Sequence, residues 1–186
     1  EKAGFSKQID LIAWHWEGGN YDDRSVKLLD ALQERLKRNN IVIRKVDLKN
    51  FKEETIKLRE VYNSAWDKNT GFVPLTNDEF DYLAKDLKLI LDPDFALVAE
   101  QNGKIVAFGL ALPNYNEIFK TIKKGRLLPT GIFKLLFGKS KIQSIRIYAL
   151  GVIEGYRKMG IEACLYGTII KEYKRKGFKH AEAGWT

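Results

Sequence analysis

Apolar and polar residues alternate from Ile142 to Val152 and then change to a four-residue period, which predicts a strand followed by a helix. The alternating part is rich in β-branched and aromatic residues, as is typical of strands. A turn that contains Gly155 and Gly160 follows. The helix begins at about residue 161, because apolar residues from there on lie on one helical face. These residues are Ile161, Leu165, Ile169 and Tyr173.

Shorter patterns predict the remaining elements. The spacing from Thr76 to Glu79 is that of a capping box, which begins a helix. Asn102-Gly103 favours the positive φ angles of a type I′ turn and therefore joins two strands as a hairpin. Helices are predicted at about 23–39, 50–66 and 79–92, and strands at about 9–16, 41–46, 95–100, 104–112 and 178–186.

The composition is that of a globular protein with one domain. The chain has 186 residues, of which 45% are hydrophobic and 30% charged. No apolar run approaches the roughly 20 residues that cross a bilayer, and the first residues lack the pattern of a secretory signal. The one cysteine, Cys164, fits a reducing cytoplasm and is expected to be a small buried residue. No spacing predicts a metal site, and His15 and His180 are expected to be structural or surface residues.

The net charge of +8 is concentrated in the second half of the chain. Residues 1–100 carry 16 basic and 19 acidic side chains, whereas residues 101–186 carry 16 basic and 5 acidic ones. Such a basic half fits a nucleic acid, a membrane surface or a polyanionic cofactor, or it only keeps the surface soluble. Neither a nucleic-acid-binding motif nor interleaved aromatic residues are present, so no nucleic acid is expected.

The turn before residue 161 has the features of an anion site. The first amides of a helix lack intrahelical acceptors, and the helix dipole is positive there. Gly160 allows a ligand to approach the backbone closely, and Arg157 and Lys158 add positive charge. A phosphate or a pyrophosphate would fit. The alternative is an ordinary connection with two basic surface residues.

Residues 157–162 resemble the acyl-CoA-binding signature of the GNAT-type N-acyltransferases, Gln/Arg-x-x-Gly-x-Gly/Ala. Five of the six positions are compatible, but Glu162 stands where the family has glycine or alanine. Residues 150–152 resemble the segment whose backbone pairs with the pantetheine arm. The resemblance therefore implies that the acyl-CoA is held by Leu150, Gly151, Val152, Arg157, Lys158, Met159, Gly160, Ile161 and Glu162.

This resemblance extends more weakly over residues 40–186 and implies the fold and the reaction. The implied fold is α/β (α+β), with a mixed central sheet flanked by helices. The implied reaction transfers an acyl group, with acetyl expected, from an acyl-CoA to an unidentified small-molecule or peptide amine. The alternative is a GNAT-like domain that has lost catalysis and serves as a binding or structural unit.

The order of segments predicts a tandem protein. Glu1, Lys2, Gly4 and Phe5 resemble the end of a GNAT domain, so residues 1–17 are interpreted as the closing strand of a preceding domain. The other interpretation is that this strand forms an edge of the one domain present. Residues 18–40 are expected to be a linker helix, and residues 41–186 a GNAT-like domain that lacks its last helix and strands. The chain is thus expected to be the C-terminal half of a tandem bacterial protein, with a tandem domain or a homodimer partner.

Residues 113–141 depart from the resemblance, because the family has a short connection there. The insertion is basic, and two short helices are predicted in it. A basic amphipathic helix can lie on a membrane. A lid or a docking surface is the more common role, so no membrane contact is expected.

No catalytic residue is assigned. Arg146 falls about where the family often has a glutamate base, and the family's tyrosine acid would lie beyond residue 186. Side chains of suitable chemistry are Tyr148, Glu154 and Tyr156, and Phe72, Pro74 and Phe80 are either acceptor contacts or core residues. Glu162 would repel a pyrophosphate unless it turns away and pairs with Lys158.

Overall fold

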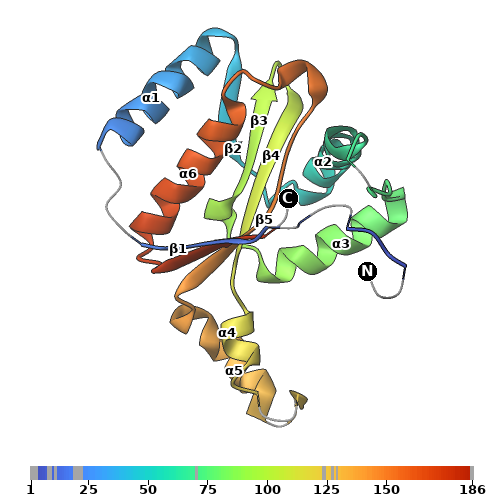
Figure 1. The fold of residues 1–186 in the computed structure, drawn as a ribbon, viewed down its shortest axis with the longest axis vertical. Coiled ribbons are helices and arrows are strands. Elements are labelled where there is room, and N and C mark those ends of the chain that lie inside the picture. Colours follow the sequence, from blue (N-terminus) through green and yellow to red (C-terminus); the bar gives the residue numbers. More distant parts are fainter. Residues whose placement is uncertain are drawn as a thin grey trace.

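The computed structural model describes residues 4–7, 10, 12–18, 23–69, 71–122, 125–126, 128 and 130–184, with only the backbone for residues 16 and 23–26. Within them a six-stranded sheet has the order β1-β6-β5-β4-β3-β2 (Figure 1). All neighbouring strands are antiparallel except β5 and β6, which are parallel. The strands are β1 (Trp14–Glu17), β2 (Ile41–Lys45), β3 (Ala96–Gln101), β4 (Lys104–Pro113), β5 (Ser144–Val152) and β6 (His180–Ala183).

Helices cover both faces of this sheet. Helices α1 and α6 pack on one face around Leu97, Val106 and Ile145, and α2 and α3 cover the other (Figure 1). The mixed sheet between helices confirms the predicted fold class. The helices are α1 (Asp23–Arg38), α2 (Phe51–Trp66), α3 (Asn77–Ile90), α4 (Asn116–Phe119), α5 (Thr130–Gly138) and α6 (Ile161–Arg175), with 3-10 turns η1 (Pro93–Phe95), η3 (Lys139–Lys141) and η4 (Glu154–Tyr156).

Local chemistry sets several boundaries as the sequence predicts. Thr76 Oγ1 accepts a hydrogen bond from the backbone N–H of Glu79, whose carboxylate accepts one from the backbone N–H of Thr76, so α3 begins with a capping box. Asn102 and Gly103 have φ angles of +50° and +82°, as a type I′ turn between β3 and β4 requires. No described helix has both the length and the apolar character needed to cross a membrane.

The segment predicted as a linker is part of the hydrophobic core. Leu29 and Leu36 of α1 are buried, and Leu29 packs against Gly167 of α6. Gln33 Nε2 donates to Thr168 Oγ1 over 3.1 Å, and Lys171 forms an ion pair with Asp30. Helix α1 is therefore held to α6 by apolar and polar contacts, while its role as a link to another domain stays a prediction.

Strand β1 forms the edge of this sheet. It pairs antiparallel with β6, and Trp14 lies opposite Ala183 while Glu17 lies opposite His180. Glu1 and Lys2, which contribute to the resemblance to a closing strand, lie outside the described residues. The strand thus completes the sheet of this chain, and its origin in a preceding domain stays a prediction.

Strand β5 carries a bulge at its middle and an open edge beyond it. Leu110 lies opposite Ala149 but Ala111 lies opposite Ile147, so Tyr148 is the extra residue of the bulge. The last pair between β5 and β6 joins Ile147 to Ala183, although β5 continues to Val152. Beyond the bulge, the edge of β5 that faces β6 is therefore not covered by that strand.

Candidate functional site

The open edge of β5 is formed by residues 148–152. Ile153 N–H donates to Val106 O of β4, and strand alternation then turns Gly151 toward β4 and Leu150 and Val152 toward the open edge. The carbonyls of Leu150 and Val152 accept hydrogen bonds from Trp66 Nε1 and Arg157 Nε over 3.3 and 3.2 Å. A ligand along this edge would meet the backbone of both residues beside these two side chains.

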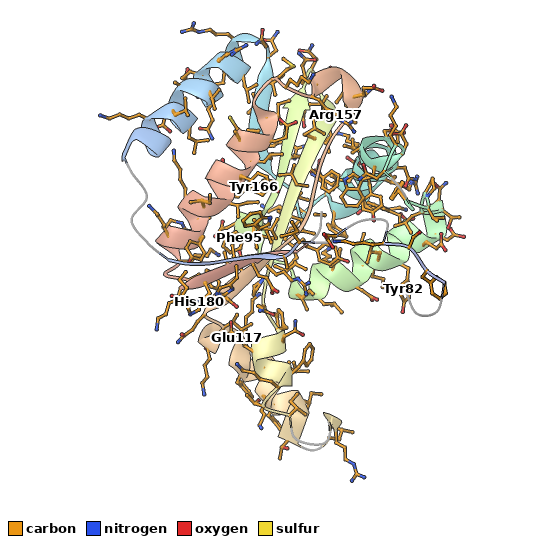
Figure 2. The ribbon with its side chains drawn as sticks, in the orientation of Figure 1. Tyr82, Phe95, Glu117, Arg157, Tyr166 and His180 are labelled. Carbon is orange, nitrogen blue, oxygen red and sulfur yellow. The ribbon has the colours of Figure 1, made fainter. Side chains whose placement is uncertain are left out.

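Arg157 is held by the backbone. Its Nη2 donates to Ala65 O at the end of α2 over 2.7 Å, and its Nε donates to Val152 O. Figure 2 shows the side chain at the end of the sheet where η4 leads into α6. Arg157 thus ties the turn to α2, a structural function that the sequence does not predict, while a phosphate contact stays a prediction.

The turn into α6 supplies a backbone concavity. Gly160 has a φ of +90° at the N-cap, and Lys158 has a φ of +65°. Ile161 is fully buried and Met159 packs against the core, so the side chains on both sides of Gly160 anchor the turn. A Cβ at Gly160 would come within 3.3 Å of Leu32 of α1, which lies beside the turn. The backbone N–H groups that begin α6 are the donors that an anion could use.

Glu162 and Gly151 have clear positions in this geometry. Glu162 lies half-buried in the first turn of α6 and forms no ion pair with Lys158. Lys158 therefore does not neutralise the charge of Glu162, which was the possibility that the sequence left open. Gly151 lies under α2, where an added Cβ would come within 2.8 Å of Ala65 Cβ. Glycine is needed there for close packing, whatever else its backbone binds.

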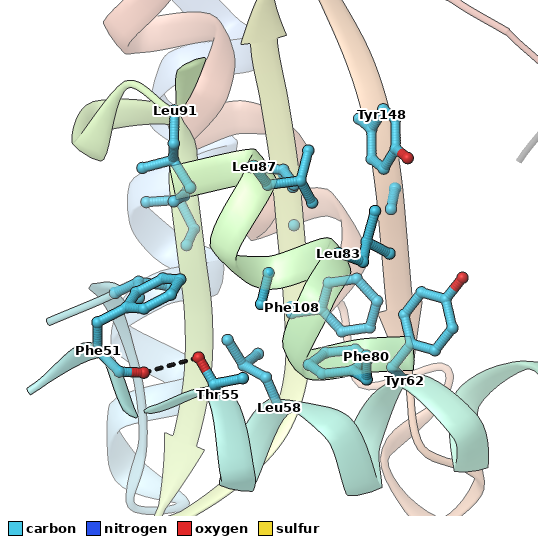
Figure 3. A pocket seen from close by; sticks show the side chains of 17 residues that line it. Phe51, Thr55, Leu58, Tyr62, Phe80, Leu83, Leu87, Leu91, Phe108 and Tyr148 are labelled. Carbon is cyan, nitrogen blue, oxygen red and sulfur yellow. Dashed lines mark hydrogen bonds between the residues drawn. The ribbon is translucent and has the colours of Figure 1, made fainter. Parts of the chain in front are cut away.

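An apolar pocket of about 90 Å³ lies between the sheet and helices α2 and α3 (Figure 3). Its only polar side-chain atoms are hydroxyls of Thr55, Tyr62 and Tyr148, and the Thr55 hydroxyl already donates to Phe51 O. A pocket with this lining fits a hydrocarbon chain. The lining residues are Val46, Phe51, Thr55, Leu58, Tyr62, Phe80, Leu83, Ala84, Leu87, Leu91, Ala96, Leu97, Phe108, Gly109, Leu110, Tyr148 and Ala149.

Two tyrosines lie at one end of this pocket. Tyr148 comes from the bulge of β5 and Tyr62 from α2, and their hydroxyls are on the same side of the pocket (Figure 3). Burial, with a smaller contribution from Tyr148, raises the pKa of Tyr62. The Tyr62 hydroxyl is therefore neutral near pH 7, and both hydroxyl groups are of a type that can donate hydrogen bonds. Phe51 and Leu91 lie at the opposite end.

The structure separates the other candidates of the sequence. Phe80 lines the pocket, whereas Phe72 does not and packs edge-on against Trp66. Glu154 is exposed and paired with Lys68, and the Tyr156 hydroxyl donates to Gln101 Oε1 over 2.6 Å. Of the three chemically suitable residues, Tyr148 is the one that lines the pocket. Tyr62 lies in the helix predicted at about 50–66 and was not among the candidates, and its hydroxyl on an apolar helix face was the available signal.

Both histidines of the chain come together at the β1–β6 pair. The rings of His15 and His180 are stacked 5.7 Å apart, and together with Glu17 they bring ligand atoms within 4.8 Å of one another. The sequence spacing does not indicate this cluster, because the residues meet only through strand pairing. These are the described side chains that could hold a metal ion, and they would have to move closer to do so.

The sheet is mixed, its parallel pair β5–β6 is open at one end, and a glycine turn leads from β5 into α6. These features define the class of this chain as an acyltransferase-like α/β domain. The chain belongs to the GNAT acetyltransferase family, whose model matches residues 57–185.

Two relatives are similar to most of the chain. Protein YghO of Escherichia coli (strain K12) is 34% identical over 161 residues, which are 84% of this chain and 40% of that protein. Bacterial ceramide synthase of Caulobacter vibrioides is 35% identical over 157 residues, which are 82% of this chain and 39% of that protein. The chain therefore spans about two fifths of the length of these curated relatives.

A solved GCN5-related N-acetyltransferase from Sphaerobacter thermophilus shares the fold. It superposes with a TM-score of 0.54 at 13% sequence identity, over 94% of this chain and 50% of that one. This likeness extends beyond the family-model match to the N-terminal part of the chain, including the region of α1.

Proposed function

We propose that this chain is an N-acyltransferase module that transfers an acyl group from an acyl-CoA to an amine. One observation carries the proposal. Strand β5 contributes both the wall of the apolar pocket, through Tyr148 and Ala149, and the adjoining open edge at Leu150 and Val152. A thioester lying along this edge would place its acyl chain beside the pocket.

The residues around the turn fit the remainder of the cosubstrate in part. The N-terminal amides of α6 and the positive charge of Lys158 suit a diphosphate. The outward backbone N–H groups of Leu150 and Val152 suit the amide carbonyls of a pantetheine arm, since the carbonyls of both residues already accept from Trp66 and Arg157. Glu162 is the residue that opposes the fit, because it adds negative charge in the first turn of α6. The site can therefore hold a CoA ester, but less tightly than a turn without this carboxylate.

The pocket favours an apolar acyl chain, or an apolar tail of the amine, over an acetyl group alone. Seventeen residues line it, and leucine, alanine and phenylalanine are the commonest of them. The relative from Caulobacter vibrioides is named a ceramide synthase, and a ceramide is an amide of a long-chain amine. That name supports a lipid-like substrate for this chain as well.

The chemistry of the proposed reaction is simple. The amine nitrogen attacks the thioester carbonyl, a C–N bond forms, the C–S bond breaks, and the proton that the amine loses ends on the departing thiolate. The thioester supplies the activated acyl group. The protein contributes position, because orienting two reactants removes much of the entropic barrier. Tyr148 can donate a hydrogen bond at the end of the pocket where the carbonyl would lie.

The pocket proposal is tested by filling the cavity. We expect the unmodified chain to bind acyl-CoA esters more tightly as the acyl chain lengthens from two to about four carbons, because each buried CH₂ contributes about 0.8 kcal/mol. Ala84→Trp, on the pocket side of α3, is expected to abolish this gain while leaving acetyl-CoA binding unchanged. Calorimetry with a series of acyl-CoA esters measures both.

Leu89→Trp is the matched control for the pocket variant. Leu89 is on the same helix, is 81% exposed and does not line the pocket, so the chain-length dependence should persist. Equal affinities for all acyl-CoA esters in the unmodified chain would contradict an acyl pocket. N-acylated product detected by mass spectrometry from an amine series would identify the acceptor.

A binding module without catalysis is the second candidate. Arg146 at the place of the family's base and the carboxylate of Glu162 favour it. Glu162→Gly is expected to increase the affinity for acetyl-CoA by about tenfold, because a like-charge contact at a partly buried site costs about 1–4 kcal/mol. Binding that only the variant shows, with no turnover by either protein, would favour the inactive module. If neither protein gives a heat of binding with acetyl-CoA, the CoA proposal is wrong.

The setting of the reaction is also a proposal. Solved and curated relatives about twice as long as this chain or longer support a tandem partner domain. Cys164 is free and buried, and burial raises the pKa of its thiol, so it is an inert packing residue. A free cysteine and a thioester cosubstrate both suit a bacterial cytoplasm.

A further inference from the structure

Helices α4 and α5 form a hairpin that projects from the end of the sheet (Figure 1). The two helices pack through small residues. Gly138 lies against Ile118, where an added Cβ would approach Ile118 Cδ1 to 3.0 Å, and Gly131 is buried beside Ile122. Lys134 Nζ donates to Thr121 O across the pair. The hairpin is thus closed on its inner side by glycines and isoleucines.

The other side of α5 is apolar and exposed. We call the exposed apolar residues of α5 the outer face: Ile132, Phe133, Leu136 and Phe137, which are 40%, 59%, 67% and 72% exposed. Phe119 at the end of α4 and Leu128 between the helices are 50% and 73% exposed. Since the inner side already uses Gly131, Leu135 and Gly138, the outer face is not needed to hold the hairpin together. A contiguous apolar face of this kind on a projecting element marks a binding surface.

The segment that contains the hairpin is strongly basic. Residues 113–141 contain seven lysines and arginines and a single acidic residue, Glu117. Glu117 is engaged within the fold, where its carboxylate accepts from the backbone N–H of Gln143 and from the Ser144 hydroxyl. Glu117 therefore does not offset the charge of Lys120, Lys134 and Lys141, which line the hairpin.

A groove between α4 and α5 combines both features. It measures about 490 Å³, and Phe133 and Phe137, at the margin of the outer face, line it together with Ile118 and Ile142. Lys120, Lys134 and Lys141 line the same groove. Aromatic side chains beside clustered ammonium groups suit a molecule with a hydrocarbon part and an anionic head.

We propose that the α4–α5 hairpin docks this protein on an anionic lipid bilayer. The outer face enters the boundary between headgroups and acyl chains, and the lysines contact lipid phosphates. Because the hairpin extends beyond the sheet, a flat surface can reach it without meeting the main body of the chain (Figure 1). The sequence predicted no membrane contact, and the exposure of the four apolar residues of α5 is the observation that changes this expectation. The docking does not depend on acyl transfer.

Vesicle flotation with the full chain tests the proposal. We expect it to float with vesicles of phosphatidylcholine and phosphatidylglycerol, and to bind vesicles of phosphatidylcholine alone at least about tenfold more weakly. Added salt should weaken the binding, because lysine–phosphate attraction is screened. Phe133→Ser/Phe137→Ser and, separately, Lys120→Gln/Lys134→Gln should each reduce it about tenfold or more.

Leu89→Ser is the control, because Leu89 is 81% exposed on α3 and is not part of the hairpin, so its loss should leave flotation unchanged. A second measurement detects contact of the outer face with the bilayer directly, instead of a loss of binding. Leu136→Cys labelled with an environment-sensitive dye should report an apolar environment on the anionic vesicles, since Cys164 is buried and remains unlabelled.

Three results would overturn membrane docking. The first is failure of the unmodified chain to float with anionic vesicles, and the second is equal flotation of both double variants. The third is a dimer in sedimentation that Phe133→Ser/Phe137→Ser converts to monomer without any vesicle binding, which would assign the outer face to a second copy. Circular dichroism of each variant establishes that it is folded.

Discussion

At the scale of single residues, the pocket rather than the turn holds the side chain that is best placed for catalysis. Arg157 supports the turn through two backbone carbonyls, and Glu154 pairs with Lys68 at the surface. Tyr148 occupies the bulge of β5 at the end of the apolar pocket. A bulge redirects a side chain from the regular alternation of a strand, so the tyrosine reaches a place that an unbulged strand would not give it.

Tyr148→Phe tests the hydroxyl at this place. The ring remains and still lines the pocket, so the KM for the acyl-CoA should change little. The turnover number is expected to fall about 10- to 100-fold, as for loss of one hydrogen-bond donor to the reacting group. Tyr156→Phe is the control, because the Tyr156 hydroxyl donates to Gln101 outside the pocket. Unchanged turnover in Tyr148→Phe would leave the residue with a packing role only.

At the scale of elements, one aspartate joins three parts of the fold. Asp94 in η1 accepts from Lys176 at the end of α6 and from Lys45 of β2, and it also pairs with Arg175. The Lys176 ammonium, with Lys45, lowers the pKa of Asp94 to about 2. This cluster connects the C-terminal end of α6 to the start of β3, and with it the position of the turn at the other end of α6.

Asp94→Asn tests this connection through its pH dependence. The folded pKa of Asp94 is lower than the unfolded one, so its contribution to stability is present above about pH 4 and is lost as the pH falls toward 2. We expect the variant to reduce the free energy of unfolding by about 1–2 kcal/mol at pH 7 and by much less near pH 2.5. Urea unfolding across this range measures the difference, and a pH-independent difference would contradict the assignment.

At the scale of the whole molecule, the packing of α1 decides what belongs to the domain. Leu29 is 6% exposed, and its methyl groups would lie 2.6 Å from a Cβ added at Gly167 of α6. The same helix places Leu32 beside Gly160. A helix in this position does more than connect, because it supports the helix whose N-terminus forms the proposed diphosphate site.

Leu29→Ala measures that support. Truncating a buried leucine costs about 2–5 kcal/mol, whereas the same change in an independent linker would cost little. We expect a loss near the lower half of this range, together with weaker binding of acetyl-CoA. Leu28→Ala is the matched control, since Leu28 is the adjacent residue and is 62% exposed. Equal stability of both variants would show that α1 is dispensable for the fold.

The order and type of most elements, and the family resemblance, follow from the amino-acid sequence alone. Side-chain periodicity reports which face of a segment is buried, and Asn102-Gly103 and the Thr76 capping box fix local backbone geometry within a few residues. The turn into α6 at Gly160 was also predictable, because the residues that indicate it are adjacent in the sequence. None of these patterns says which other segment covers a buried face.

The pocket, the edge position of β1 and the role of Arg157 become visible once the chain is folded. The pocket combines residues of α2, α3 and three strands that are up to about 100 positions apart, and each reads in sequence as an ordinary core residue. The bulge that turns Tyr148 toward the pocket depends on the register between β4 and β5. The outer face of α5 is exposed because none of the described elements packs on it. Such features depend on long-range packing, which local propensity does not encode.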